Sequence, residues 1–389
     1  MYIYCPEDII LRDFFIIAFM QKVKFQQVES TDFFKVLNQR IEAYFKTKHI
    51  SRKSSALFVF KNLFFFALAV IFYSFILSGN FFGWQLYPLF IFFGLFITIF
   101  LFSIAHDASH NAVSEKNWVN RFFSYTWNLM GIASYFWELK HNLAHHGFTN
   151  VPGKDDDIEQ SKLVRLNPNA ERKWFHQFQH FYAPFLYAFL SINIIYIKDF
   201  KLLMQKNFGN RKVEKHPFKE VVILFFTKAL FITYMLIIPK IILNISWGEI
   251  LLLHVAMHLT IGLFIGFILV PVHVTNESEY RLPDENGLVH SDWGKHQIEA
   301  TVDFAAESYL VNWLTGGLNT HVAHHLYPHI NHIHYVAITK IIKQTAREFN
   351  IPYRNRTLIK ILSEHIKFLK ALGNEKNPTQ NNQFNAKAA

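Results

Sequence analysis

The chain alternates long apolar stretches with segments rich in charged and aromatic residues. Four of these apolar stretches reach about 20 residues, the length that an α-helix needs to cross a hydrocarbon layer about 30 Å thick. We therefore predict four transmembrane helices. Their approximate ranges are 57–78, 84–105, 219–241 and 249–271.

The positions of Lys and Arg indicate how these helices are oriented. The turn between the first two spans has neither residue, and the connection at 240–248 has only Lys240. Residues 21–55 and 106–219 are rich in both, and such residues accumulate on the cytoplasmic side of membranes. We expect an all-α polytopic membrane protein with two membrane hairpins below a cytoplasmic helical cap, and with both termini in the cytoplasm.

Shorter apolar patterns outside the spans predict helices at the membrane surface. Residues 33–45 carry apolar side chains at helical spacing among basic residues, a pattern typical of interfacial helices. The aromatic segments 118–140 and 174–197 are too polar to span and predict two more helices of this kind. The chain thus divides into an N-terminal segment (1–55), a membrane domain (56–350), and a C-terminal helix with a disordered tail (351–389).

The first 20 residues lack the features of a secretory signal. The apolar run from Ile9 to Met20 is short, contains Arg12 and Asp13, and has no small-residue cleavage site. Our hypothesis is that residues 1–20 derive from an upstream start codon and that translation begins at Met20. Mass spectrometry of the native N-terminus tests it.

The composition fits a membrane protein. Of the 389 residues, 51% are hydrophobic and 17% aromatic, which is unusual for a soluble domain and suits lipid contact. The net charge of +10 follows the inside–outside pattern of the loops, so we expect no nucleic-acid partner. The single cysteine, Cys5, excludes an internal disulfide and a metal site built from several thiolates.

Three histidine clusters suggest the chemistry. The clusters are His106 and His110; His141, His145 and His146; and His321, His324 and His325. Residues three or four positions apart on a helix share a face, so each cluster can direct its imidazoles at one point. Imidazole is the commonest protein ligand of transition metals. Eight histidines exceed the roughly four to six ligands of one ion, so we predict two metal ions.

The predicted topology allows the clusters to form one site, because all three fall on the cytoplasmic side of the membrane. His273 directly follows the fourth span and is expected to be a ninth ligand. Two further pairs have HxxxH spacing, His254 with His258 and His176 with His180. The first pair lies at mid-membrane depth and the second on a predicted interfacial helix. Both pairs are therefore weaker candidates.

The clusters favour oxidation over hydrolysis. A zinc hydrolase usually carries an acid–base Glu beside its ligands, as in HExxH, and none of the three clusters has one. Redox-active iron with O₂ would suit a substrate that offers only C–H bonds, and lipid acyl chains are the most abundant such substrate beside a membrane. The residues alone predict a membrane metalloenzyme that oxidises lipid.

The residues in and around the clusters resemble the membrane fatty acid desaturase family over about residues 25–350. HDASH at 106–110, HNLAHHGFTN at 141–150 and GGLNTHVAHHLYPHI at 316–330 stand in the order of that family's three histidine boxes. The segment FHQFQHFYAP at 175–184 is similar to bacterial acyl-CoA and acyl-lipid desaturases related to the linoleoyl-CoA, or front-end, branch.

This resemblance implies a di-iron centre in a bacterial cell membrane. Such a centre uses O₂ and two electrons to place a cis double bond in a fatty acyl chain on CoA or lipid, which would lie in a bent apolar tunnel under the metals. By position, the iron ligands would be His106, His110, His141, His145, His146, His273, His321, His324 and His325. The candidates for hydrogen bonding to these ligands are Asp107, Asn150, Asp155, Asp157 and Asn319.

Two features differ from front-end members, which often begin the third box with Gln and carry a fused cytochrome b5 domain. Here the box begins with His321, and no His-Pro-Gly-Gly haem motif occurs. We expect the electrons to come from a separate protein, a ferredoxin or a free cytochrome b5. The nearest alternative is another oxidation with the same boxes, such as hydroxylation or carotenoid ketolation. A metal transporter is a more distant one, with His254 and His258 as the candidate path.

Overall fold

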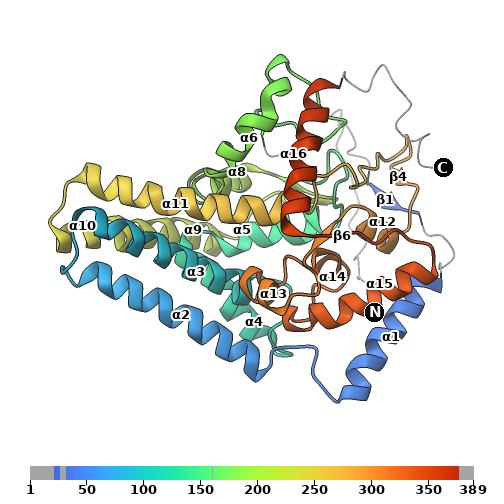
Figure 1. The fold of residues 1–389 in the computed structure, drawn as a ribbon, viewed down its shortest axis with the longest axis horizontal. Coiled ribbons are helices and arrows are strands. Elements are labelled where there is room, and N and C mark those ends of the chain that lie inside the picture. The colour runs from blue at the N-terminus through green and yellow to red at the C-terminus, as the bar shows by residue number, and fades with distance from the viewer. Residues whose placement is uncertain (1–21, 27–31, 160, 376–389) are drawn as a thin grey trace.

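The computed structural model describes residues 22–26, 32–159 and 161–375. Long helices extend from one side of the molecule, and a helical cap encloses their other end (Figure 1). The four predicted spans are confirmed as helices long and apolar enough to cross a membrane. They are Ala56–Leu77 (α2), Gly83–Ser109 (η1 and α3), Phe218–Leu243 (α9, η6 and α10) and Trp247–Leu269 (α11).

The spans begin and end where the sequence offers caps. The Ser246 hydroxyl accepts a hydrogen bond from the Glu249 backbone N–H at 3.1 Å, which starts α11. Asn244 has a left-handed backbone (φ 50°) and ends α10, which turns the chain back into the next span. Each pair of consecutive spans therefore forms a hairpin.

The second and fourth spans are the inner pair. In their most apolar windows, 61% of the second span and 50% of the fourth are buried, against 28% for each of the other two. Gly94 brings α3 close to α11, because a Cβ there would lie 2.5 Å from Met257 Cγ. Since α3 and α11 lead directly into His106 and His273, their close packing brings two parts of the site together.

The segment between the hairpins is more broken than predicted. The helix expected over 118–140 is divided by Gly131, whose backbone is left-handed (φ 71°). The helix predicted over 174–197 is part of a longer bent segment, Trp174–Met204. This segment bends by 72° between Tyr187 and Leu190, and it is apolar enough to be a broken span or a re-entrant loop. Its elements are η4 (Trp174–Phe178), α6 (Gln179–Tyr187), α7 (Leu190–Asn193), η5 (Ile194–Lys198) and α8 (Asp199–Met204).

The chain that leads into the second histidine cluster consists of four short helices in succession. They are α4 (Asn117–Ser124), η2 (Tyr125–Met130), α5 (Ser134–Glu138) and η3 (Leu139–His145). The last of these, like η5, is a π-helix, a wide turn that occurs frequently at functional sites.

The cap is built from the N-terminal helix and the C-terminal third of the chain. Its helices are α1 (Asp32–Lys48), α12 (Trp293–Glu299), α13 (Tyr309–Thr315), α14 (His321–Leu326), η7 (His332–His334), α15 (Tyr335–Glu348) and α16 (Leu358–Asn374). The helix predicted over 33–45 is present as α1. Its apolar residues Phe33, Leu37 and Ile41 are buried against α15, so the face that suggested membrane contact belongs to the core of the cap.

The described residues also contain three pairs of two-residue strands, two of which join distant parts of the chain within the cap. β1 (Lys24–Phe25) pairs in parallel with β4 (Leu288–Val289), and β5 (Asp303–Phe304) pairs in parallel with β6 (Asn355–Arg356). β2 (Asn207–Phe208) and β3 (Arg211–Lys212) form a hairpin. The fold class is thus all-α with small strand pairs. The start proposed at Met20 lies outside the described residues, as does the tail from 376, whereas α16 continues to Asn374.

Candidate metal centre

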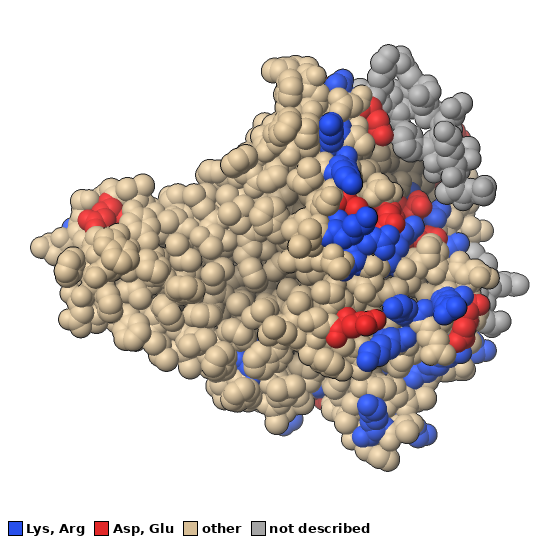
Figure 2. Space-filling model, in the orientation of Figure 1, with Lys and Arg blue, Asp and Glu red and all other residues tan. Residues whose placement is uncertain are grey.

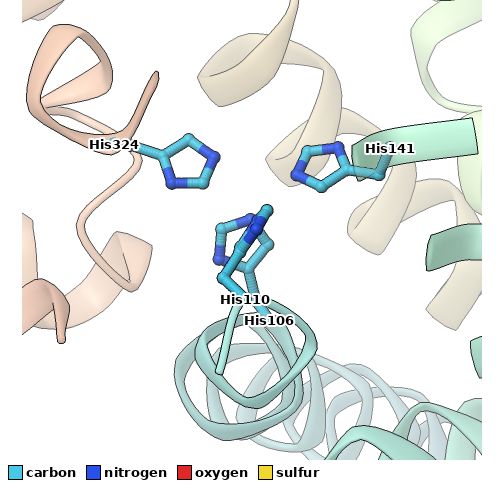
Figure 3. Close-up of side chains that lie close together, drawn as sticks. All are labelled: His106, His110, His141 and His324. Carbon is cyan, nitrogen blue, oxygen red and sulfur yellow. The ribbon is translucent and has the colours of Figure 1, made fainter. Parts of the chain in front are cut away.

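Nine buried histidines converge between the inner spans and the cap. They are the nine predicted ligands, and each is at most 9% exposed. They come from the end of α3, the π-helix η3, the turn after α11, and α14. Figure 3 shows imidazoles from three of these elements pointing towards a common point. The structure therefore brings together residues separated by up to 219 positions in the chain, from His106 to His325.

The histidines form two groups of four with one histidine between them. The first group is His106, His110, His141 and His324, and the second is His145, His273, His321 and His325. In each group the candidate ligand nitrogens all lie within 4.8 Å of one another. His146 Nε2 lies 3.1 Å from His141 Nε2 and 3.0 Å from His324 Nε2, beside the first group.

The π-helix decides how the second cluster is shared between the groups. The His146 backbone N–H donates to the His141 carbonyl at 2.9 Å, five residues back. A turn of that width aligns residues i and i+5, so His146 lies on the face of His141 while His145 turns to the second group. The second cluster is thus divided between the two groups, although His141 and His145 also lie close enough, with Asp157, to share a metal ion.

The ring nitrogens fit a metal ligand set. The Nε2 atoms of His106, His110 and His325 are buried without a hydrogen-bond partner among the described residues. Such an orphaned polar atom costs about 1–3 kcal/mol unless something else satisfies it. His273 Nε2 and His321 Nε2 lie 2.8 Å apart, as two nitrogens aimed at one position do. A metal ion in each group would resolve these contacts.

The protonation states also suit metal binding. Burial and neighbouring histidines hold the pKa of His141, His146 and His324 well below the usual range, and the same holds for His273 and His325. Neutral imidazole is the form that binds metals. These histidines are therefore ready to coordinate without first losing a proton.

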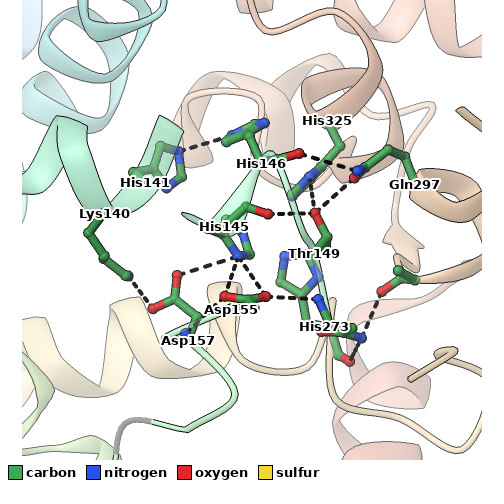
Figure 4. Close-up of polar contacts among 12 residues, drawn as sticks. Lys140, His141, His145, His146, Thr149, Asp155, Asp157, His273, Gln297 and His325 are labelled. Carbon is green, nitrogen blue, oxygen red and sulfur yellow. Dashed lines mark hydrogen bonds and ion pairs between the residues drawn. The ribbon is translucent and has the colours of Figure 1, made fainter. Parts of the chain in front are cut away.

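The carboxylates of Asp155 and Asp157 contact Nδ1 of His145 (Figure 4). Both Asp155 oxygens lie 3.1 Å from His145 Nδ1, and an Asp157 oxygen lies 3.5 Å from the same atom. Burial lowers the pKa of His145, but the two carboxylates outweigh burial and raise it. Because Nδ1 is directed at the carboxylates, Nε2 of His145 is free to face the second group.

Asn150 links the loop that contains Asp155 to the turn after α11 that carries His273. Its backbone is left-handed (φ 56°), and its N–H donates to Asp155 at 2.8 Å. Its side-chain amide donates to the carbonyls of His273 and Ala300 at 2.9 and 3.2 Å. Asn150 thus fixes the backbone of His273 relative to the Asp155 loop. Asn319 differs, since its side chain accepts from the Thr315 hydroxyl and donates to the Ala305 carbonyl rather than bonding an imidazole.

Asp107, a predicted residue, belongs to a buried chain of polar groups whose other members, His332 and Lys61, were not predicted from the sequence. Its carboxylate accepts from the ring and the backbone N–H of His332 at 2.8 and 3.1 Å and lies 4.0 Å from His106 Nδ1. His332 Nε2 is 2.8 Å from the Lys61 ammonium on α2. The signal for Lys61 was its charge inside an apolar span, which requires a buried partner. Nothing local in the sequence identifies His332, which is 225 residues from Asp107.

Thr149 and Gln297 were also missed. The Thr149 hydroxyl lies within hydrogen-bonding distance of His325 Nδ1 (3.1 Å) and of Gln297 Oε1 (2.8 Å). The Gln297 amide donates to the His146 carbonyl at 3.3 Å. These two residues connect the second cluster to the third, and only the folded chain brings them together (Figure 4).

The weaker histidine candidates lie outside both groups. His254 Nε2 is 2.7 Å from Tyr196 Oη, and His258 Nδ1 is 2.9 Å from Ser191 Oγ. His176 Nε2 bonds the Lys162 carbonyl. In the described part of the chain, no cluster able to hold a metal includes these histidines or His180.

A cavity of about 160 Å³ adjoins the site. Histidines of both groups line it, among them His106 and His273. Apolar side chains of α3, α11 and the bent segment form most of the remaining wall, including Leu101, Ile194 and Ile261. The apolar tunnel expected under the metals has its counterpart in this cavity.

Comparisons with known proteins agree with this geometry. A sequence model of the fatty acid desaturase family matches residues 82–357. An sn-1 linoleoyl-lipid 6-desaturase of Arthrospira platensis is 30% identical over 88% of this chain and 93% of its own. A protein of the same name from Synechocystis sp. is 30% identical over 91% and 98%.

An acyl-lipid (8-3)-desaturase of Physcomitrium patens is 32% identical over 90% of this chain and 74% of its own length. The three relatives cover both hairpins and the cap, so the likeness is not limited to the histidine boxes. With four candidate spans and two histidine groups in one fold, the chain is an integral membrane protein and an oxidoreductase. It belongs to the fatty acid desaturase family.

Proposed function

We propose that this desaturase places a cis double bond in an acyl chain of a membrane lipid, using two iron ions held by the nine histidines. The observation that carries the proposal is that two groups of buried imidazoles open onto one largely apolar cavity. A substrate without polar groups near its reacting carbons can be held there only by shape and apolar contact.

The first group with His146 would bind one iron, and the second group would bind the other. When bound, the iron pair supplies the reduction of O₂ that removes two hydrogens from the chain. The protein's own residues orient the ligands: Asp155 directs His145, Thr149 supports His325, and Asn150 fixes the His273 backbone. The cavity wall excludes water from the reacting carbons.

The names of the relatives support a lipid-bound substrate, because three of them are described as acting on acyl or linoleoyl lipids. The cavity supports it too. Its apolar wall is formed by α3, α11 and the bent segment, all of which are apolar enough to lie in a bilayer. We therefore favour an acyl chain esterified in a membrane lipid over a soluble carrier.

We further propose that the cap and both termini face the cytoplasm and that residues 56–350 form the membrane domain. Lys and Arg gather on the cap, while the flanks of the spans show almost none on the face in Figure 2. This distribution supports the orientation through the positive-inside rule. A basic cap also suits an acidic electron carrier, a ferredoxin or a cytochrome b5 with its reductase.

The proposal is tested by expressing the chain in a host that makes saturated and monounsaturated acyl chains. Gas chromatography–mass spectrometry of the fatty acid methyl esters, after separation of lipid classes, should show a new species lighter by two hydrogens. The His145→Ala, His146→Ala double variant should lack it. His290→Ala is the matched control, because His290 is 62% exposed and bonds Asp284 outside the site.

A product with an added oxygen would contradict desaturation and indicate a hydroxylase. A product that survives in the double variant would contradict the assigned site. Absence of product despite an added ferredoxin or cytochrome b5 system, with two irons bound, would reject the lipid substrate alone.

A further inference from the structure

The cavity beside the histidines has a charged end. Most of its wall is apolar or belongs to the metal groups, but four charged side chains also line it. These are Lys140, Asp157, Lys198 and Asp199. A pocket with one charged end suits a ligand with one polar end, since an apolar chain alone leaves such groups without partners.

Ion pairing accounts for three of these four groups. Lys140 forms a direct ion pair with Asp157, and Asp199 pairs with Lys228 at 2.5 Å. Among the residues that the structure describes, the Lys198 ammonium forms one ion pair, with the already paired Asp157 at 3.5 Å. An ammonium has three donors. Lys198 therefore carries the charge and the donors that a ligand would use.

Among the four charged residues, Asp157 and Lys198 are the more exposed pair, since the side chains of Lys140 and Asp199 are only 8% and 2% exposed. The side chains of Asp157 and Lys198 are 22% and 16% exposed, whereas Leu101 and Met130 on the apolar wall are 1% and 3% exposed. A lipid that enters with its acyl chain would place its methyl end in the closed part. Its carbonyl end would then stay near Lys198.

Both lysines stand on the two π-helical turns that adjoin the cavity. Lys140 is the second residue of η3, which carries the ligands His141 and His145, and Lys198 is the last residue of η5. Isolated π-turns in otherwise α-helical segments occur frequently at functional sites. The same local distortion thus aims the ligands and the lysines at one space.

We propose that Lys198 donates a hydrogen bond to the carbonyl oxygen of the bound acyl chain and so selects which carbons lie beside the metals. The inference rests on the proposed function and deepens it. Asp157 stands between Lys198 and His145, 3.5 Å from a nitrogen of each. The carbonyl is then held close to the histidine groups. The carbons beside these groups are therefore only a few bonds along the acyl chain from the carbonyl, and the double bond forms in the carboxyl half of the chain.

The test compares Lys198→Met, Lys198→Arg and the control Lys201→Met in the same expression host. Lys201 is exposed one turn further along, outside the cavity. Double-bond positions are read from mass spectra of dimethyl disulfide adducts, and bound iron is measured in the purified proteins. In Lys198→Met we expect at least about tenfold less product, the factor for losing one charge-assisted hydrogen bond, together with a spread of double-bond positions.

The Arg variant, which keeps a cationic donor, should restore both the amount and a single position. Iron content should stay at the wild-type ratio in all three variants. Unchanged amount and position in Lys198→Met would overturn this inference while leaving the proposed function intact. Loss of iron in Lys198→Met would also overturn it, because the residue would then support the metal groups.

Absence of product from the wild-type chain would reject the proposed function and this inference with it. The carbonyl could belong to a lipid ester or to a thioester carrier, since both present the same oxygen. Feeding labelled saturated acyl-CoA or labelled phospholipid to membranes, with rapid separation of the two pools, distinguishes these sources. In either pool, the product should depend on Lys198 in the same way.

Discussion

The histidine pairs of α3 and α11 have the same spacing and are both buried, yet among the described residues only the α3 pair belongs to a group that could hold a metal ion. His106 and His110 face imidazoles from η3 and α14. His254 and His258 face the hydroxyls of Tyr196 and Ser191. Spacing along a helix identifies a candidate pair, but the segments packed against it decide whether the pair binds metal or a hydroxyl.

The largest effect should come from His324→Ala. His324 belongs to the first group and also lies beside His146 and His325, so its loss opens the ligand set where the two groups meet. We expect more than about a hundredfold loss of activity, above the range for losing a ligand's partner, and less bound iron. Inductively coupled plasma mass spectrometry and fatty acid analysis check this. Full iron content in His324→Ala would contradict the assignment of His324 as a ligand of the first group.

Asp155→Asn should have the next largest effect. The substitution removes the carboxylate charge beside His145 Nδ1 and leaves the orientation of the imidazole ring less defined. Loss of such a partner typically costs about 10–100-fold in metal affinity or activity. Asp156→Asn is the matched control, because Asp156 bonds Gln205 instead. Equal metal affinity in the two variants, measured by chelator competition, would contradict the role of Asp155.

Thr149→Val should give a smaller loss. The variant keeps the shape of the side chain but removes the hydroxyl beside His325 Nδ1. One neutral hydrogen bond contributes about 0.5–1.5 kcal/mol, so a loss of roughly threefold to tenfold in product is expected. Thr149→Ser should retain activity, and a Ser variant as weak as the Val variant would indicate that packing rather than the hydroxyl matters.

The smallest effect is expected at the pair that resembles a metal site by spacing alone. His254→Phe removes the bond to Tyr196 inside the membrane, which is worth about 0.6 kcal/mol on average for such contacts. Iron content and product should stay at wild-type levels, with a Tm lower by a few degrees at most. A fall in iron content would contradict the conclusion that the histidine pair of α11, unlike that of α3, lies outside the metal groups.

The parts of the fold that could be predicted are those with a strong local pattern. The spans follow from apolar length, and the histidine clusters from their spacing and their position relative to the ends of the spans. The family itself was identified from the residues around the clusters, and this identification is confirmed. These features depend on residues close together in the chain.

The parts that could not be predicted depend on departures from regular helices or on distant partners. The π-turn at η3 places His146 beside His141 and directs His145 to the second group, and the spacing of apolar residues does not predict such a turn. The left-handed Gly131 breaks a helix that its aromatic pattern favours. Lys61 and His332 meet across 271 residues, a contact set by the packing of α2 on the cap.

The central claim is that nine histidines hold two metal ions beside the acyl cavity. The most direct test is the iron-to-protein ratio of the chain purified after expression in iron-rich medium, with His290→Ala as the control. The account predicts two irons per chain in both proteins. A ratio of one or less in fully folded protein would contradict it.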